Sequence, residues 1–175
     1  MTKNIIFAVF FYNLSLFASS SLNDNFGCSI GSCQDGYGEY VFENRDKYIG
    51  EFSNGLMDGN GEYKVLNGEH YKGEFKNNEF HGYGKYTFPS GQYYEGDYKN
   101  GKRNGIGILV YLNGDTHIGE FKNGERHGLG IIAHRNGHIQ SWDFYKGTLF
   151  IKLSLDTVML QLFTTYYDRI EILEK

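Results

Sequence analysis

Proline and cysteine are both scarce in this chain. Among its 175 residues there is one proline, Pro89, and there are two cysteines, Cys28 and Cys33. These counts exclude a proline-rich linker and a disulfide-dense scaffold, and two cysteines without a nearby histidine pair cannot form a four-ligand zinc site. A basic excess is also lacking, because the formal net charge is −4. We therefore expect no nucleic-acid partner.

The composition that remains favours packed β structure. Hydrophobic residues make up 40% of the chain and aromatic residues 17%, with 24 glycines, so the chain is not of the disordered class. Apart from the N-terminus, no stretch is long and apolar enough to span a membrane. Aromatic residues are typical of strands, and glycine is typical of turns and of close backbone approach.

The N-terminus has the pattern of a secretory signal. Lys3 precedes an apolar run from Ile5 to Ala18, and small residues follow up to Ser20. We expect residues 1–20 to be a signal peptide, which would place the protein outside the cell or in the endomembrane lumen. The alternative is an uncleaved segment that anchors the protein in a membrane.

Residues 21–34 are predicted to be a linker. In an oxidising compartment Cys28 and Cys33 would form a small disulfide, whereas in a reducing one they would be free thiols.

A 23-residue repeat organises the rest of the chain. Each unit begins with a ring, continues with a glycine, an acid and a second ring, and then has a Gly-x-Gly and a closing glycine. The first ring recurs as Tyr48, Tyr71, Tyr94 and His117, and the acid recurs as Glu51, Glu74, Asp97 and Glu120. The Gly-x-Gly recurs as Gly59/Gly61, Gly82/Gly84, Gly105/Gly107 and Gly128/Gly130.

Side chains within a unit alternate with a period of two, and Asn-Gly pairs separate the runs, so each unit is predicted to be a β-hairpin. We expect Tyr71 to lie opposite Tyr86 and Phe75 opposite Gly82. The glycines would then leave room for rings to lie over bare backbone. Isolated hairpins are barely stable, so the units should pair into one meander that twists and has an aromatic concave side.

The stretches YKGEFKNNEFHGYG and HIGEFKNGERHGLG carry a close resemblance to the MORN (membrane occupation and recognition nexus) repeat. The resemblance covers about residues 35–147. It implies an all-β fold, an elongated antiparallel meander of tandem hairpins that serves as a scaffold, a dimerisation surface or a membrane-associated module, and it implies no enzyme.

Residues 148–175 are expected to cap the array as a strand followed by a helix from near Asp156. The alternative for this tail is an amphipathic helix that contacts a membrane.

We expect a non-enzymatic scaffold without a cofactor, which binds a protein partner and can also form a homodimer. Its predicted contacts on the concave face are Tyr71, Tyr86, Tyr94 and Tyr98. The repeated acids are interpreted as a solvated ladder, and the histidines as loop and packing residues, so no catalytic or metal site is expected.

A membrane module is the alternative function. The predicted loops carry basic residues that could contact anionic lipid headgroups: Lys99, Lys102, Arg103, Lys122 and Arg126. The competing interpretation is ordinary solubilising charge, because Glu79 and Glu125 dilute the patch.

Overall fold

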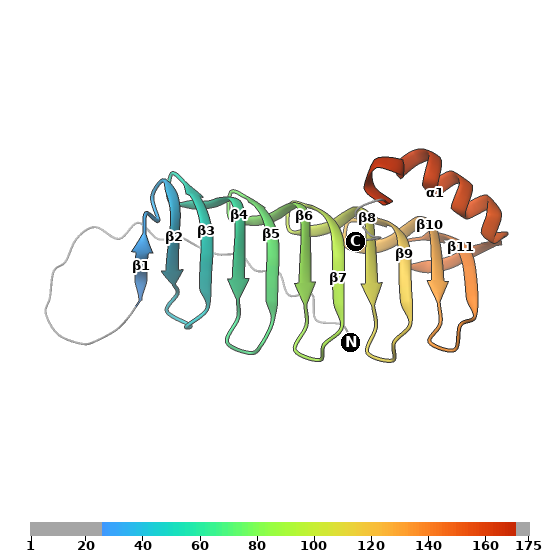
Figure 1. Ribbon diagram of the computed structural model, residues 1–175, viewed down its shortest axis with the longest axis horizontal. Helices are drawn as coiled ribbons and strands as arrows, with labels where there is room; N and C mark the ends of the chain where they lie inside the picture. Colours follow the sequence, from blue (N-terminus) through green and yellow to red (C-terminus); the bar gives the residue numbers. More distant parts are fainter. Residues whose placement is uncertain (1–25, 171–175) are drawn as a thin grey trace, which may run out of the picture.

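The structure is a computed structural model that describes residues 26–170 as one open antiparallel sheet with a C-terminal helix. Each of its twelve strands pairs with the next one in the chain, so the hairpins form a single row (Figure 1). The strands are β1 (Gly27–Gly31), β2 (Gly36–Val41), β3 (Lys47–Ser53), β4 (Leu56–Lys64), β5 (His70–Lys76), β6 (Glu79–Thr87), β7 (Tyr93–Lys99), β8 (Lys102–Val110), β9 (Thr116–Lys122), β10 (Glu125–Ala133), β11 (Ile139–Tyr145) and β12 (Thr148–Leu153), and the helix is α1 (Leu155–Ile170).

The predicted all-β meander of hairpins, with its helical C-terminal cap, is confirmed. The sheet is longer than the predicted range of 35–147 at both ends. Strand β1 lies inside the predicted linker and pairs with β2, and β12 lies inside the predicted cap and pairs with β11. The predicted signal peptide, residues 1–20, lies outside the described residues.

Two kinds of turn alternate along the row, and they lie at opposite ends of the strands (Figure 1). At the tight turns both central residues have positive φ, as at Asn100 (51°) and Gly101 (71°), which is the backbone that Asn-Gly tolerates. At four of the longer turns an asparagine side chain closes the loop, and the turn that contains Pro89 has no asparagine. Asn67 Oδ1, for example, accepts a hydrogen bond from the Glu69 N–H at 2.9 Å.

The pairing inside a hairpin differs in part from the expected one. Tyr71 lies opposite Tyr86, as predicted, but the register then shifts, and Phe75 lies opposite Phe80 instead of Gly82. The reason is a β-bulge at the Gly-x-Gly. Gly73 pairs with Gly84 and Glu74 pairs with His81, so Gly82, which has a φ of 55°, and Tyr83 are two extra residues in their strand. Gly82 lies instead opposite Tyr98 of the next hairpin.

The second glycine of the Gly-x-Gly has the role that the sequence predicted. Gly84 lies opposite Gly73, and a Cβ on Gly84 would meet the ring of Tyr71. The Tyr71 hydroxyl donates to the Glu74 carbonyl at 2.9 Å, which fixes the ring over the bare backbone. The same ring–glycine contact recurs between Tyr94 and Gly107.

Rings of successive repeats contact one another edge to face and form a continuous core. In each case the first ring of one unit meets the second ring of the next. The ring centroids are 4.9 Å apart for Tyr48 and Phe75, 5.3 Å for Tyr71 and Tyr98, 4.8 Å for Tyr94 and Phe121, and 4.9 Å for His117 and Phe144. This row of rings joins each hairpin to the next, in addition to the hydrogen bonds between their strands.

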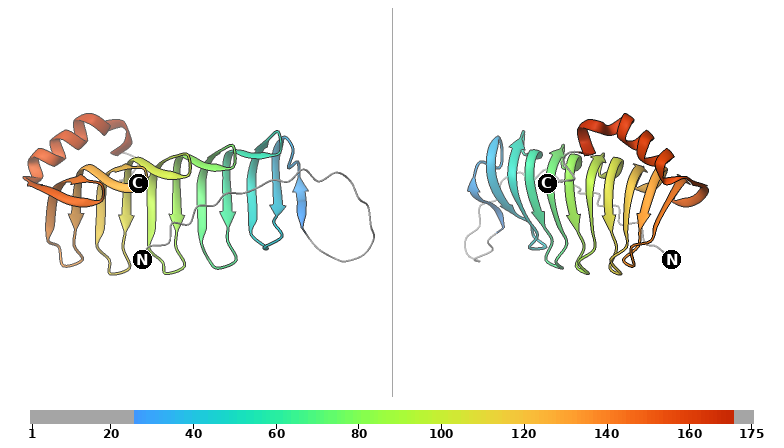
Figure 2. Two further views of the ribbon diagram at one scale, coloured as in Figure 1. Left: turned by 180° about the vertical axis from the view of Figure 1, so that it is seen from behind. Right: turned by 45° about the vertical axis from the view of Figure 1, so that its right-hand side comes forward.

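Helix α1 packs against the opposite face of the sheet, which we call the outer face. Ser154 caps the helix, because its Oγ accepts a hydrogen bond from the Thr157 N–H at 3.2 Å. Two buried helix residues, Val158 and Leu162, pack on a group of sheet residues, and α1 lies along the C-terminal hairpins in both views of Figure 2. The sheet residues in this contact are Ile106, Leu129, Ile131 and Leu153.

Candidate functional site

The aromatic residues predicted to bind a partner lie mostly inside the core. Tyr71 and Tyr94 are 1% exposed and Tyr98 is 7% exposed, so they do not form an open surface. Tyr86 is half-buried, and its hydroxyl donates to Glu69 at 2.6 Å. Bulged strands bend, and this bend accounts for the burial of rings that were expected on an open face. The strands curve visibly in Figure 2.

Burial also changes the chemistry of these phenols. It raises the pKa values of Tyr71, Tyr94 and Tyr98 well above the ordinary tyrosine value, so all three hydroxyls stay protonated. Tyr71 and Tyr94 pack and donate hydrogen bonds to backbone carbonyls, and Tyr98 packs against the rings of both.

The repeated acids lie at the surface, with Glu51 and Glu74 exposed and Asp97 and Glu120 half-buried, and they also have a structural role. The Glu74 carboxylate accepts a hydrogen bond from the Tyr83 N–H at 2.9 Å, beside the bulge glycine of its hairpin. Asp97 and Glu120 accept in the same way from the backbone of Ile106 at 3.2 Å and Leu129 at 3.1 Å. A Cβ on the bulge glycine would meet the acid, as Glu74 shows at Gly82, which explains why acid and glycine recur together.

The predicted basic patch divides into two groups. Arg103 donates to the Gly124 carbonyl at 2.7 Å, and Arg126 donates to the Gly147 carbonyl at 3.0 Å, so each arginine joins its own hairpin to the tight turn of the next. Both guanidinium groups also lie near core rings, Arg126 at 4.9 Å from the centroid of Phe144. The three lysines of the set, Lys99, Lys102 and Lys122, are exposed.

The histidines do not assemble a metal site in the part of the chain that the structure describes, where no three His, Cys, Asp or Glu side chains lie in a metal-binding arrangement. His134 contacts Asp115 at 3.0 Å instead. His117 is fully buried between Phe121 and Phe144. Across residues 26–170 we also find no helix with the length and apolar character needed to cross a membrane.

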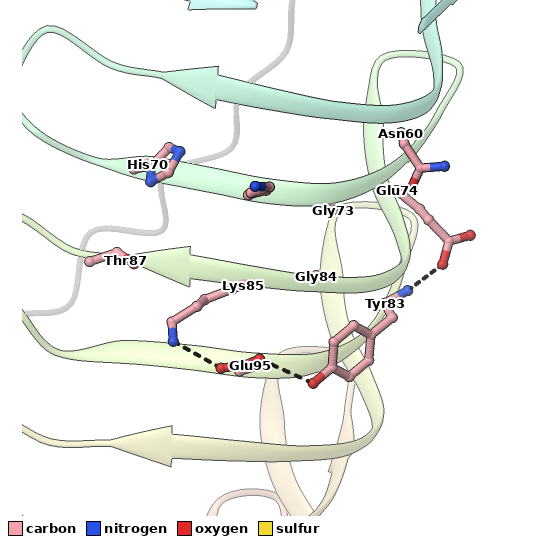
Figure 3. Close-up of a pocket in the computed structure, with 10 residues that line it drawn as sticks. Asn60, His70, Gly73, Glu74, Tyr83, Gly84, Lys85, Thr87 and Glu95 are labelled. Atoms are coloured by element: carbon pink, nitrogen blue, oxygen red, sulfur yellow. Dashed lines mark hydrogen bonds and ion pairs between the residues drawn. The ribbon is translucent and has the colours of Figure 1, made fainter. Parts of the chain in front are cut away.

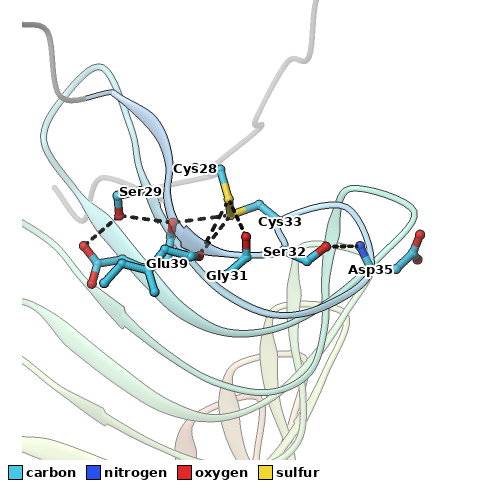
Figure 4. The surroundings of a disulfide bond; sticks show 8 residues. Cys28, Ser29, Gly31, Ser32, Cys33, Asp35 and Glu39 are labelled. Atoms are coloured by element: carbon cyan, nitrogen blue, oxygen red, sulfur yellow. Dashed lines mark hydrogen bonds between the residues drawn. A yellow bond between two sulfur atoms is a disulfide. The ribbon is translucent and has the colours of Figure 1, made fainter.

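At the N-terminal end, Cys28 and Cys33 form a disulfide beside the edge strand β1, with Cα atoms 5.8 Å apart (Figure 4). The loop that follows is tied to the next tight turn, because the Asn54 N–H donates to Asp35 Oδ1 at 2.8 Å. The bridge thus holds the first strand of the sheet close to the repeats.

The candidate site is a shallow depression of about 400 Å³ on the outer face of β4 to β7 (Figure 3). Its floor includes the backbone of Gly73 and Gly84. The side chains that define it are Asn60, Lys72, Glu74, Tyr83, Lys85 and Glu95. Lys85 pairs with Glu95 at 2.9 Å, and the Tyr83 hydroxyl donates to the same carboxylate at 3.3 Å.

Our sequence reasoning missed this depression, although the sequence does contain a signal for it. The residue between the two repeat glycines points to the outer face, and it is polar or aromatic in two successive units, Asn60 and Tyr83, before it becomes aliphatic at Ile106 and Leu129. The aliphatic units are the ones that α1 covers, and the earlier ones are left open.

Comparison with known proteins agrees with the repeat period. The family model for the MORN repeat matches residues 48–64, 71–93, 94–116 and 117–139. No curated protein matches the sequence.

Among solved structures, the SAS-4 (dCPAP) TCP domain of Drosophila melanogaster, in complex with a proline-rich motif of Ana2 (dSTIL), aligns with 81% of this chain and 99% of its own length. The identity is 13% and the TM-score 0.36, a similarity too low to support an inference about function. The four repeat matches and the row of hairpins agree, and the chain therefore belongs to the MORN-repeat family, whose repeats generally form non-enzymatic scaffolds for protein or membrane interaction.

Proposed function

We propose that this chain is a non-enzymatic scaffold that binds a protein partner through the outer face of β4 to β7. The observation that carries the proposal is that α1 covers only part of that face. Helix α1 occupies it over the C-terminal hairpins, whereas the equivalent surface two repeats earlier forms an open depression lined by half-exposed and exposed side chains. This replaces the buried tyrosines as the proposed binding surface.

A scaffold also has to hold its surface in a fixed shape, and contacts between repeats favour this. Asp46 is buried and accepts hydrogen bonds from the Leu66 N–H at 3.0 Å and from the Tyr63 hydroxyl at 3.1 Å. Asp115 accepts from the Arg135 N–H at 3.0 Å one longer turn further on. Each bond joins neighbouring repeats, so the outer face has little freedom to deform.

The test is affinity capture from the source cell with the full-length chain as bait. We expect a partner that the wild type retains and that Tyr83→Asp, on the outer face, loses. Lys122→Gln is the matched control, because it also lowers the net charge by one but lies at a tight turn. Thermal unfolding of both variants must first show that they fold. Equal recovery of every bound protein with Tyr83→Asp would overturn the proposed surface.

The alternative is a peripheral module that binds anionic phospholipid through the basic turns. Its support is the exposure of Lys99, Lys102 and Lys122 at neighbouring turns. It is weakened because both arginines of the patch donate their hydrogen bonds to turn carbonyls. Co-sedimentation with phosphatidylserine vesicles that Lys99→Glu/Lys102→Glu abolishes would favour this function over the scaffold.

We also propose that the protein is secreted or resides in the endomembrane lumen, with membrane anchoring as the alternative. Support comes from the Lys3 and Ile5–Ala18 pattern and from the Cys28–Cys33 disulfide, which belongs in an oxidising compartment. N-terminal sequencing of the protein from its source is the test. A mature chain that begins near Ser21 is expected, and an intact Met1 would contradict it.

A further inference from the structure

We propose that the free edge of β12 is the interface of a homodimer, in which β12 pairs antiparallel with β12 of a second copy. This interface lies at the end of the array, apart from the outer face of β4 to β7, and it therefore adds to the scaffold function.

The two ends of the sheet have unpaired strand edges. Among residues 26–170, β1 pairs only with β2 and β12 pairs only with β11. The outward edge of each of these strands therefore has backbone N–H and C=O groups that another strand can bind. A helix cannot replace that strand, because its own backbone groups are paired within it.

Exposed apolar side chains gather at the β12 end of the sheet. Of the twelve exposed large hydrophobic side chains in the described residues, seven lie between residues 139 and 160. In β12 itself Leu149 is 49% exposed and Ile151 is 48% exposed. The strand has no proline, and its single charge is Lys152. It thus lacks the proline and the clustered charges that keep edge strands apart in other proteins.

The register of the sheet favours pairing with β12 of a second copy over pairing with its β1. Cross-strand partners form one continuous row from Ile30 in β1 to Leu153 in β12, and the next row runs from Gly31 to Lys152. From these rows β1 extends towards the longer turns, whereas β12 extends towards the tight turns. If β1 of a second copy continued the sheet in register, it would overlap β12 only at these two rows. Pairing of β12 with β12 can use all six residues of the strand.

The side chains of β12 favour one register of this pairing. Leu149 and Lys152 are on the face that carries the rings, because they lie opposite Phe144 and Trp142, whereas Leu153 is on the outer face with α1. Directly opposite residues of an antiparallel pair share a face. Leu149 would therefore lie opposite Lys152 of the second copy, and Thr148 opposite Leu153. This register places no like charges opposite each other, whereas a register with Lys152 opposite itself would do so.

The same register brings further apolar surface together. Because the two strands run in opposite directions, the tight turn of the second copy, with its exposed Tyr145, would lie beside the start of α1. There it would meet Leu155 and Met159, which are exposed and lie one helical turn apart. Each contact occurs twice in a two-fold dimer. A two-fold axis perpendicular to the sheet also leaves both outer faces on the same side, so the dimer would present two depressions to one partner.

The experiment measures the mass of the full chain by size-exclusion chromatography with light scattering over a range of concentrations. We expect a dimer for the wild type and a monomer for Ile151→Lys, because two lysines would then lie close together at the two-fold axis. Leu112→Lys is the matched control, since Leu112 is 73% exposed but lies at a longer turn, and it should leave the dimer intact. Thermal unfolding of both variants must first show that they fold.

A mixture of two variants tests the two-fold symmetry. Ile151→Glu should also be monomeric alone, but an equimolar mixture of Ile151→Lys and Ile151→Glu should recover the dimer mass, because opposite charges then meet at the axis. A wild type that is monomeric at every concentration, a dimer that Ile151→Lys leaves intact, or a mixture that stays monomeric would each overturn the proposal. Masses that grow beyond a dimer would indicate open head-to-tail assembly and would overturn it as well. The capture experiment with Tyr83→Asp does not depend on any of these results.

Discussion

His117 occupies the place that a tyrosine holds in the three preceding repeats. The hydroxyls of Tyr48, Tyr71 and Tyr94 each donate to a backbone carbonyl three residues further on, at 2.9 to 3.1 Å. His117 is 0% exposed, and neither of its ring nitrogens has a hydrogen-bond partner among the described residues. A buried polar group without a partner costs about 1–3 kcal/mol.

His117→Tyr should therefore stabilise the protein. The new hydroxyl would donate to the Glu120 carbonyl, as its equivalents do, and we expect a gain of about 1–3 kcal/mol in the free energy of unfolding, measured in urea at neutral pH. The control is Tyr94→Phe, which removes the corresponding hydroxyl and should cost about 1 kcal/mol. A loss of stability in His117→Tyr would mean that the fourth repeat has no room for the phenol.

The same residue makes stability depend on pH. Burial lowers the pKa of His117 from 6.5 to about 3, so the folded protein keeps the ring neutral while the unfolded chain takes up a proton below 6.5. Stability should thus be unaffected by this group above pH 6.5 and should fall as the pH drops from 6.5 towards 3, by up to about 1.4 kcal/mol per pH unit. In His117→Tyr this part of the pH dependence should disappear. Parallel curves for the two proteins across that range would contradict the assignment.

Gly107 tests the steric role of the repeat glycines. A Cβ there would meet the ring of Tyr94, so Gly107→Ala should cost about 1–3 kcal/mol or more through overpacking. At Gly124 a Cβ would meet nothing, and only the positive φ of 92° opposes a side chain, so Gly124→Ala should cost about 1 kcal/mol. Chemical unfolding of the two variants measures the difference, and equal losses would show that backbone strain, not ring contact, selects glycine.

At the scale of elements, the sequence predicted the strands of the repeats and their order, but not β1, which lies in the predicted linker. Alternation and Asn-Gly turns are local signals, and they were sufficient for the hairpins. The predicted register of Phe75 was wrong, because the bulge adds two residues to one strand and an insertion of two leaves a period of two unchanged. The burial of Tyr94 was missed because closure of the aromatic face depends on the curvature of the whole sheet.

The position of α1 on the sheet could not be predicted from the repeat period alone. The tail predicted a helix, but its seat is marked only by a change of outer-face residues from Asn60 and Tyr83 to Ile106 and Leu129, a difference between repeats. The depression lies where the same outer-face positions are Asn60 and Tyr83. A comparison that considers only the positions shared by all repeats misses the depression, because it is formed where the repeats differ in sequence.

Val158 should be essential for the packing of α1 on the sheet. It is 0% exposed, and Val158→Asp would place a carboxylate against Ile106 and Ile131. We expect α1 amides to lose hydrogen-exchange protection while β3 to β6 keep theirs. Leu160→Asp is the control on the same helix, since Leu160 is 67% exposed and should leave protection unchanged. Loss of protection throughout the sheet would show that α1 is needed for the fold of the repeats.

At the scale of the whole molecule, the sheet is a linear array of hairpins. Every strand pairs only with those before and after it, and α1 packs mainly on β10 and β11. In such an array stability is close to a sum of unit and interface terms, so a local change should remain local. This also allows the side chains of the depression and those under α1 to differ without affecting each other.

Removal of the disulfide at the N-terminal edge tests whether a local change in one repeat leaves distant repeats unaffected. Cys28 and Cys33 are separated by five positions, and for so short a loop the chain-entropy estimate is about 2 kcal/mol. Cys28→Ser/Cys33→Ser should therefore release β1 and part of β2, with faster hydrogen exchange there, because β1 is an edge strand with one neighbour. Exchange in β5 to β7, which form the depression, should stay at the wild-type rate, since at least two hairpin pairings separate it from the bridge. Faster exchange in β5 to β7 would mean that the array folds as one cooperative body, and the outer face of one repeat could then not be altered without altering the rest.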